Sequence, residues 1–233
     1  MKRSVYSKLT LMAMFFMLAQ LAFAQVREKR DVSNFNELSV SHAFVVELSV
    51  GSEESLEIEV DDRYINDVIT EVRGGKLTIK MRDSRSTRRM NESPRAFLTV
   101  KSLDKISLSG AVNLTTFDPL EGEKLDVDIS GASVLKMEIE VEDFRLEASG
   151  ACVVKMEGTA TKQLVKTTGA TSYSAYDLES EYADIRVSGA GSARVYVSEE
   201  LDVRASGASD VKYKGSPSVN SNTSGASSVR KGR

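Results

Sequence analysis

The feature that most constrains the fold is a short motif that returns seven times between Ser109 and the C-terminus. Each time, a serine or threonine is followed by Gly-Ala, and successive glycines are 21, 19, 19, 20, 18 and 18 residues apart. The glycines are Gly110, Gly131, Gly150, Gly169, Gly189, Gly207 and Gly225. A regular period of about 20 residues is typical of a solenoid, in which each repeat is one structural unit.

Apolar and polar residues alternate on both sides of each glycine. Around Gly131 the apolar positions are Leu125, Val127 and Ile129 before it and Leu135 and Met137 after it. A period of two predicts half-buried strands, so each glycine is expected to mark a corner between two strands. Glycine suits a corner because it adopts positive φ without a Cβ clash. The serine or threonine before each glycine is expected to link neighbouring repeats by hydrogen bonds.

Two arrangements of strands compete for this pattern. An antiparallel meander would need two alternating classes of turn at opposite ends of the sheet. In a parallel β-helix each repeat is one rung, and the same corner returns at a spacing of about 4.8 Å along the axis. Only one kind of corner recurs, so the sequence predicts an all-β protein whose residues 101–233 form a parallel β-helix of about seven rungs, each of 18 to 21 residues.

The first residues have the composition of an export signal. Three basic residues precede an apolar stretch from Leu9 to Phe23, and Ala22-Phe23-Ala24 supplies the small residues that signal peptidase accepts. The apolar stretch is too short to be a convincing membrane anchor. Residues 1–24 are therefore predicted to be a signal peptide, and the mature chain is expected in the periplasm or at the cell surface without a membrane span.

Residues 25–100 lack the glycine period but keep the strand pattern. Expected strands are Phe44 to Val50, Leu56 to Val60, a hairpin of Val68 to Arg73 with Lys76 to Met81, and Arg95 to Val100. Only Asp61 to Asp67 is expected to make a helical turn. This segment is predicted to cap the first rung, because an uncovered end would expose unpaired strand edges. The basic stretch Arg82 to Arg89 is interpreted as a solvated loop, with polyanion binding as the alternative.

The net charge, the single cysteine and the single histidine exclude several classes of function. Removing residues 1–24 takes three basic and no acidic residues from totals of 31 and 34, which leaves a net charge of about −6 and argues against a globally basic nucleic-acid-binding protein. Cys152 is the only cysteine, so no internal disulfide can form, and it is interpreted as a small corner residue. His42 is the only histidine and is expected to lie outside the repeats, and no triad, metal-ligand set or phosphate loop surrounds it. We therefore predict no enzyme activity, metal or cofactor.

One outward row of the predicted coil is rich in positive charge. The position five residues after each glycine lies between two inward positions and is occupied by Thr115, Lys136, Lys155, Ser174, Arg194, Lys212 and Arg230. Stacked rungs would align the five basic residues into a stripe. We hypothesise that this stripe binds an extended anionic polymer such as an acidic glycan. The alternative is an ordinary solvated face, partly neutralised by Glu138 and Glu157.

Tyrosines offer a second candidate surface. The five in the repeats are Tyr173, Tyr176, Tyr182, Tyr196 and Tyr213. Tyr173 and Tyr213 fall on inward positions and are expected in the core. Tyr176 and Tyr196 both follow their glycines by seven residues, so they are expected to form an exposed pair on successive rungs. Such a pair either stacks on a sugar or packs across the rungs.

The chain resembles the head GIN domain family. The resemblance rests on the signal peptide, Lys76-Leu77-Thr78-Ile79, the approach Phe97 to Val100, the corners at a period of about 19 residues and the ending Tyr213 to Pro217 followed by Ser224-Gly225-Ala226. It implies a right-handed parallel β-helix in an exported bacterial protein of adhesin type. Family members often have Gly-Ser-Gly at the corner where this chain has Ser-Gly-Ala, and no functional residue is carried over.

These observations favour a secreted, non-enzymatic binding module whose partner is an extracellular or cell-envelope glycan. One alternative is a carbohydrate-active β-helix enzyme, for which Asp126, Asp128, Asp184 and Asp202 are the candidate carboxylates. Another is a structural scaffold that self-associates. Convergent carboxylates in a groove would favour the enzyme, and concentration-dependent assembly without ligand would favour the scaffold.

Overall fold

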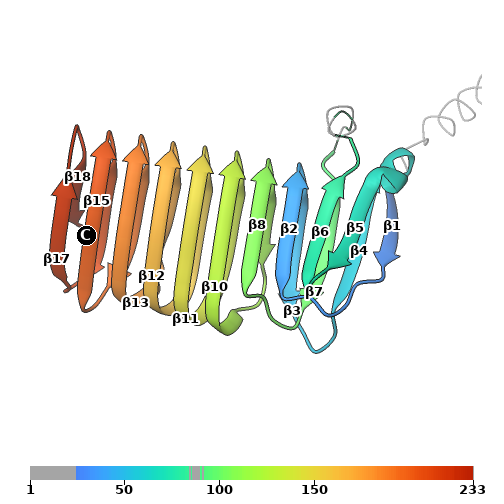
Figure 1. Cartoon of the computed structure of the whole chain (residues 1–233), viewed down its shortest axis with the longest axis horizontal. Helices are drawn as coiled ribbons and strands as arrows, with labels where there is room; N and C mark the ends of the chain where they lie inside the picture. Colours follow the sequence, from blue (N-terminus) through green and yellow to red (C-terminus); the bar gives the residue numbers. More distant parts are fainter. Residues whose placement is uncertain (1–24, 84, 86–89, 91, 233) are drawn as a thin grey trace, which may run out of the picture.

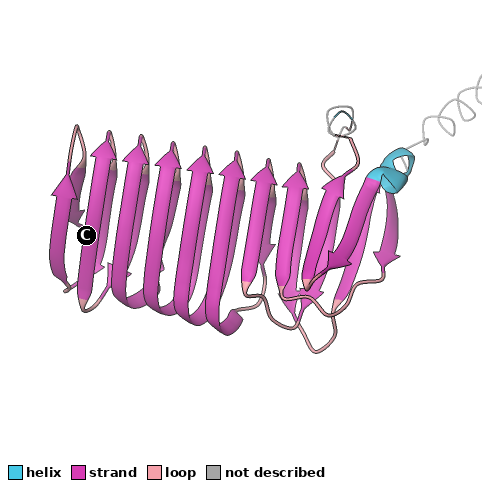
Figure 2. Cartoon of the chain, viewed as in Figure 1, coloured by secondary structure: helices cyan, strands magenta, loops and turns pink. Residues whose placement is uncertain are grey.

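The structure is a computed structural model that describes residues 25–83, 85, 90 and 92–232. The predicted signal peptide, residues 1–24, lies outside the described residues, as do residues 84, 86–89 and 91 of the basic stretch and its flank. The described chain is almost entirely β-structure, with a single 3₁₀ helix, η1, at Asp62–Asp67 (Figure 2). That helix lies where the sequence predicts a helical turn.

Nine strands precede Leu120. They are β1 Gln25–Arg30, β2 Glu37–His42, β3 Val45–Val50, β4 Ser55–Asp61, β5 Val68–Arg73, β6 Lys76–Met81, β7 Arg95–Val100, β8 Lys105–Gly110 and β9 Asn113–Thr116. The remaining strands are β10 Leu120–Gly131, β11 Val134–Gly150, β12 Val153–Gly169, β13 Ser172–Gly189, β14 Ser192–Val197, β15 Glu200–Gly207, β16 Asp210–Gly215, β17 Ser218–Thr223 and β18 Ser228–Lys231. All belong to one sheet.

The strands coil into a parallel β-solenoid of about seven turns, as the sequence predicts. Each corner glycine lies beside the next, with Gly110 paired to Gly131, Gly131 to Gly150 and Gly150 to Gly169. The antiparallel meander is thereby excluded for the repeats. In Figure 1 the strands that end at the glycines run upward in front, the returning strands lie behind, and the chain advances from right to left. The coil is therefore right-handed.

The glycines are required by how closely the corners stack. Gly131 has φ of 94°, and a Cβ on it would lie 2.4 Å from the carbonyl oxygen of Gly110 in the preceding rung. The same oxygen accepts a hydrogen bond from the Ala132 amide at 2.7 Å. A side chain at the glycine would both strain the backbone and displace this bond.

The corners are closed from inside by the residue two positions after the glycine. Ser209 Oγ donates to the Ser206 carbonyl at 2.9 Å, and Cys152 Sγ makes the equivalent contact to the Ser149 carbonyl at 3.4 Å. Both side chains are buried. The prediction that the serine before each glycine links the rungs holds at one described position, where Ser188 Oγ reaches the Thr167 carbonyl at 3.5 Å. Elsewhere these hydroxyls face outward, because the alternation places them opposite the inward row.

The coil starts before the glycine repeats. β2 pairs in parallel with both β6 and β8, and β3 with both β7 and β9, so parallel pairing crosses the expected division at residues 100 and 101. His42 stands opposite Gly110 with φ of 79°, which makes it the first member of the corner row. The expectation that His42 lies outside the repeats is therefore wrong. The antiparallel pairs β1–β4, β4–β7 and β5–β6 cover the N-terminal end.

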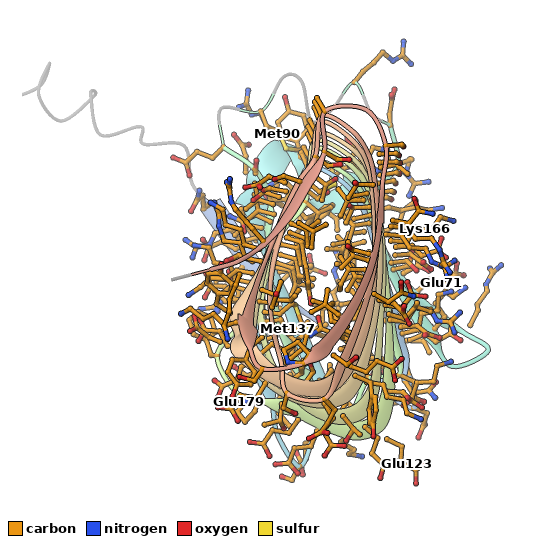
Figure 3. The ribbon with its side chains drawn as sticks, turned by 90° about the vertical axis from the view of Figure 1, so that its left-hand side faces the viewer. Glu71, Met90, Glu123, Met137, Lys166 and Glu179 are labelled. Carbon is orange, nitrogen blue, oxygen red and sulfur yellow. The ribbon has the colours of Figure 1, made fainter. Side chains whose placement is uncertain are left out.

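The core fills the space between the two walls of the coil (Figure 3). The residues predicted to point inward around Gly131 are all buried, with Met137 labelled inside the ribbon in Figure 3. Tyr173 is fully buried, as predicted, and Tyr213 is partly buried against the core. Stacked apolar rows of this kind supply most of the stabilisation of the coil.

Candidate functional site

The basic ladder, defined as Lys136, Lys155, Arg194, Lys212 and Arg230, is aligned as the sequence predicts. Lys136 pairs with Lys155, Arg194 with Lys212 and Lys212 with Arg230. Ser174 occupies the row between Lys155 and Arg194. The row lies on the wall that follows the glycine corners, where cationic side chains on consecutive rungs can meet successive charges of one extended ligand.

Part of the ladder is engaged within the protein. Lys155 pairs with Glu157, and this contact raises the pKa of the lysine, chiefly through the side-chain hydrogen bond. Asp210 lies 3.1 Å from Arg230 Nη2 and 3.5 Å from Lys212 Nζ. Within the described part of the chain, no ion pair involves Lys136 or Arg194. These two residues are the cations of the ladder that are available without breaking an internal pair.

Tyr176 and Tyr196 are both half-buried beside the ladder. The Lys214 ammonium lies 4.5 Å from the centre of the Tyr176 ring, which is a cation–π contact. Lys214 is paired in register with Tyr196. Lys214, from a later rung, thus already covers the Tyr176 ring. This geometry favours packing across the rungs over stacking on a sugar.

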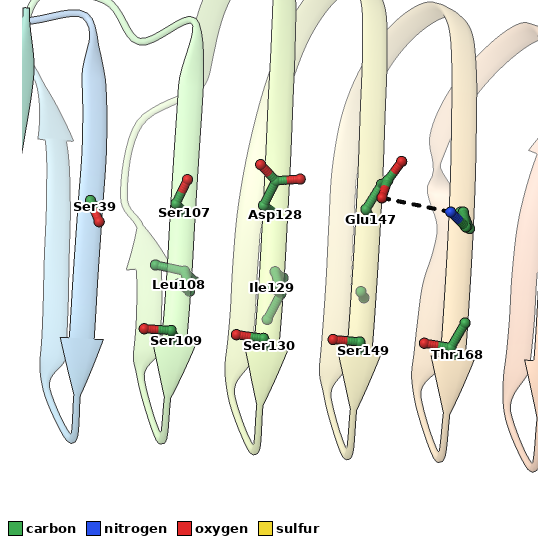
Figure 4. A pocket seen from close by; sticks show the side chains of 12 residues that line it. Ser39, Ser107, Leu108, Ser109, Asp128, Ile129, Ser130, Glu147, Ser149 and Thr168 are labelled. Atoms are coloured by element: carbon green, nitrogen blue, oxygen red, sulfur yellow. Dashed lines mark ion pairs between the residues drawn. The ribbon is translucent and has the colours of Figure 1, made fainter.

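The opposite wall carries a row of hydroxyl groups beside a shallow groove (Figure 4). Ser109, Ser130, Ser149 and Thr168 are consecutive in register, and the hollow beside them has a volume of about 440 Å³. A second hollow of about 320 Å³ shares Thr168 and continues along the later rungs. Together the two hollows form a groove that runs along the coil axis.

Charge changes sign along this groove. Asp128 and Glu147 stand on its earlier rungs, and Lys166, Arg186 and Arg204 stand in the same row on the later ones. Lys166 Nζ meets Glu147 at 3.8 Å where the sign changes. Because one half of the groove is acidic and the other half is basic, a polyanion that lay along the whole groove would be repelled by the acidic half.

Another hollow lies on the same wall, farther from the corners. It has a volume of about 400 Å³ and is lined in part by Leu164, Tyr182, Lys162, Asp184 and Glu200. Tyr182 is 41% exposed. Sequence reasoning missed this site, although its signal is readable: Leu164 precedes Gly169 by five residues and Tyr182 precedes Gly189 by seven, which are outward positions where apolar side chains are unexpected.

Three of the four candidate catalytic carboxylates, Asp126, Asp184 and Asp202, share one row and line the hollow beside Tyr182, and each of the four contacts a neighbouring side chain. Asp128 meets Lys105 at 2.9 Å, Asp184 meets Arg186 at 2.6 Å, and Asp202 accepts from Asn220 at 2.8 Å. Asp126 meets Lys124 at 2.6 Å. Each carboxylate therefore has a partner on its own face.

Groups that could supply other chemistry are also accounted for in the described residues. Cys152 is a buried free thiol within a corner. Among residues 25–83, 85, 90 and 92–232, no group of three or more His, Cys, Asp or Glu side chains is placed to hold a metal ion. The same described ranges contain no helix with the length and apolar character needed to cross a membrane.

Comparison with known protein families identifies a match. A family model described as "Putative auto-transporter adhesin, head GIN domain" covers residues 34–217. A comparison with curated protein sequences gave no significant match. The family match includes β4 to β7 of the antiparallel cap, but not β1, and the glycine corners from Gly110 to Gly207.

Solved structures from Bacteroides and Parabacteroides species share the fold. A protein of Bacteroides fragilis described as a "putative adhesin" aligns with a TM-score of 0.85 at 19% identity, over 89% of this chain and 97% of that one. A "putative adhesin" of Parabacteroides merdae gives a TM-score of 0.70 at 19% identity, over 91% and 98%. A "Putative lipid binding protein" of Parabacteroides distasonis gives 0.71 at 18% identity, over 91% and 98%. At these identities the likeness concerns the fold alone.

Proposed function

The chain belongs to the head GIN domain family, and on this premise we propose that it is an exported, non-enzymatic binding module that holds an extended anionic glycan along its basic ladder. The glycan belongs to the cell envelope or to the extracellular surroundings. The predicted signal peptide at residues 1–24 supports export to the periplasm or the cell surface.

The observation that carries the proposal is the shared register of the ladder. Lys136 and Lys155 occupy adjacent rungs, and Arg194, Lys212 and Arg230 occupy three further consecutive rungs. Adjacent strands are about 4.8 Å apart, so a chain laid along the axis meets a cation at nearly every rung. An extended polymer gains from several such contacts at once, whereas a small anion gains from only one or two.

Binding is favoured over catalysis by the state of the carboxylates. Acid–base hydrolysis of a glycan needs two carboxyl groups that face one substrate. Asp126 and Asp184 line one hollow, but their carboxylates are paired with Lys124 and Arg186 on the same wall. The proposal therefore assigns these acids to surface ion pairs, which contribute to solubility.

The test compares paired charge removals on the two walls. The Lys136→Gln/Arg194→Gln protein, without residues 1–24, is titrated with an oligogalacturonate by calorimetry at low and moderate salt. The matched control is Lys166→Gln/Arg204→Gln, which removes the same charge from the opposite wall. We expect the ladder variant alone to bind about tenfold or more weakly and to show a smaller salt dependence.

Two results would oppose the proposal. Equal losses in the two variants would indicate a response to net charge alone. Retention of full affinity in the ladder variant would place binding elsewhere. Dextran serves as the uncharged probe. We expect the ladder substitutions to leave the affinity for dextran unchanged.

A further inference from the structure

Two apolar side chains stand out in the outward rows of the wall that precedes the corners. Leu164 shares its row with Lys105, Asp126, Arg145, Asp184, Asp202 and Asn220. Tyr182 shares its row with Lys124, Asp143, Lys162, Glu200 and Ser218. All other members of both rows are polar or charged. Leu164 and Tyr182 lie on adjacent rungs, and neither is needed to fill the core, which lies on the other side of the wall.

The polar groups around this pair are arranged in a consistent order. Tyr182 is flanked by Lys162 on the preceding rung and by Glu200 on the following one. Leu164 is flanked in the same sense by Arg145 and Asp184. Each apolar side chain therefore has a hydrogen-bond donor on one side and an acceptor on the other.

Some of these polar groups are free to bind a ligand, and another is held in place by a neighbouring side chain. Among the residues that the structure describes, no ion pair or hydrogen bond involves the side chains of Lys162 or Glu200 or the Tyr182 hydroxyl. Asp184 is held by Arg186, whose Nε and Nη2 donate to its two oxygens at 3.1 and 2.6 Å. The hollow of about 400 Å³ is within the usual range for small-molecule sites.

We propose that this hollow binds a pyranose unit of a neutral glycan. The C–H face of the sugar lies against the exposed Tyr182 and the half-buried Leu164, because apolar C–H groups pack on an aromatic ring and an aliphatic side chain. Sugar hydroxyls donate to Glu200 and accept from Lys162, since a hydroxyl does both. A polyanion is disfavoured because carboxylates from β10, β11, β13 and β15 line the hollow. The site is independent of the basic ladder, which lies on the other wall.

The test uses the protein without residues 1–24, which retains every residue that the structure describes. Saturation-transfer NMR is recorded with neutral xylo-, cello-, manno- and malto-oligosaccharides, and dissociation constants are measured by calorimetry. We expect at least one of these series to bind, and Tyr182→Ala to weaken it about tenfold or more. Tyr182→Phe should stay within about threefold, because the ring rather than the hydroxyl supplies the packing surface.

Matched controls distinguish sugar binding in this hollow from binding on the opposite wall. Tyr176→Ala removes a tyrosine from that wall and should leave neutral-sugar binding unchanged, as should the ladder variant Lys136→Gln/Arg194→Gln. Glu200→Gln and Lys162→Gln should each weaken binding severalfold. The proposal is overturned if none of the four series binds, if binding survives Tyr182→Ala, or if Tyr182 is required only for a cationic probe such as tetramethylammonium.

Discussion

The hydroxyl of Tyr173 lies 3.0 Å from Oε1 of Gln163, and both side chains are buried in the middle of the coil. Gln163 Nε2 in turn donates to Ser180 Oγ at 2.6 Å, and Ser180 Oγ donates to the Tyr196 carbonyl at 2.7 Å. Burial raises the pKa of the Tyr173 hydroxyl, which keeps it protonated as a donor. A chain of hydrogen-bonded side chains thus crosses the largely apolar core, with each member in contact with the next.

Removing two members of this chain together should cost less than the sum of the two single removals. Tyr173→Phe leaves Oε1 of Gln163 buried without a donor, and we expect a loss of about 1–3 kcal/mol in the free energy of unfolding. Adding Gln163→Met removes the stranded acceptor and keeps the shape, so the double variant should lose less than the sum of the single losses. Denaturant titrations of the four proteins measure this, and strict additivity would show that the two side chains are not coupled.

Corner glycines should be far less tolerant of substitution than glycines elsewhere. Gly150 has φ of 105°, and a Cβ there would lie 2.3 Å from the Gly131 carbonyl oxygen. Gly150→Ala should lower the free energy of unfolding by about 2 kcal/mol or more. Gly122→Ala is the control, because the nearest atoms to its Cβ would be 4.0 Å away. Thermal and denaturant unfolding give both values, and similar losses at the two positions would contradict this account of the corners.

The period of the glycines is sufficient to predict the rungs, their register and the inward rows. One corner geometry per repeat forces the corners to stack. Once the corners are stacked, the count from the glycine determines which residues are paired on adjacent rungs and which point inward. The same logic cannot place His42 in the corner row, since it is not a glycine. A side chain fits at this corner because, among the described residues, β2 pairs with β6 only from Glu37 to Val40, so no earlier corner lies against His42.

The positions of the basic ladder can be predicted from the sequence, but the contacts that its side chains make cannot. Counting from the glycines gives the row of Lys136 and Arg194, but it does not show that Asp210 serves both Lys212 and Arg230. That contact depends on side-chain reach across rungs. Grouping the tyrosines by residue type does not reveal the hollow at Tyr182, because the hollow depends on the row that Tyr182 shares with Lys162 and Glu200.

The thiol of Cys152 should behave as a corner group and not as a reactive one. It is fully buried and contacts the carbonyls of Ser149 and Gly131 at 3.4 and 3.7 Å. Alkylation by iodoacetamide, followed by intact mass, should be slow in the native protein and fast in denaturant. Cys152→Ser should stay within about 1 kcal/mol of the parent, because serine makes the same contact at Ser209. Rapid native labelling would show that the corner opens.

Asp210 restrains the C-terminal part of the ladder, and neutralising it should strengthen anion binding. The hydrogen bond from Ser228, then Arg230 and Lys212, lower the pKa of this carboxyl, while partial burial acts in the opposite direction. We expect Asp210→Asn to bind oligogalacturonate severalfold more tightly at neutral pH, since two cations lose their internal partner. Asp202→Asn removes the same charge from the opposite wall and should have a smaller effect.

The same lowered pKa fixes how this carboxylate contributes to stability. Because the folded pKa lies below the ordinary value of 3.8, ionised Asp210 stabilises the fold fully above that value, and the contribution is lost as the pH falls through the folded pKa. Asp210→Asn should therefore be less stable than the parent at pH 7, and the difference should shrink in acid. Unfolding titrations at pH 7 and below pH 3.8 measure it. A difference that grows in acid would mean that Asp210 is not held by its cationic neighbours, and tighter binding by the variant would then need another cause.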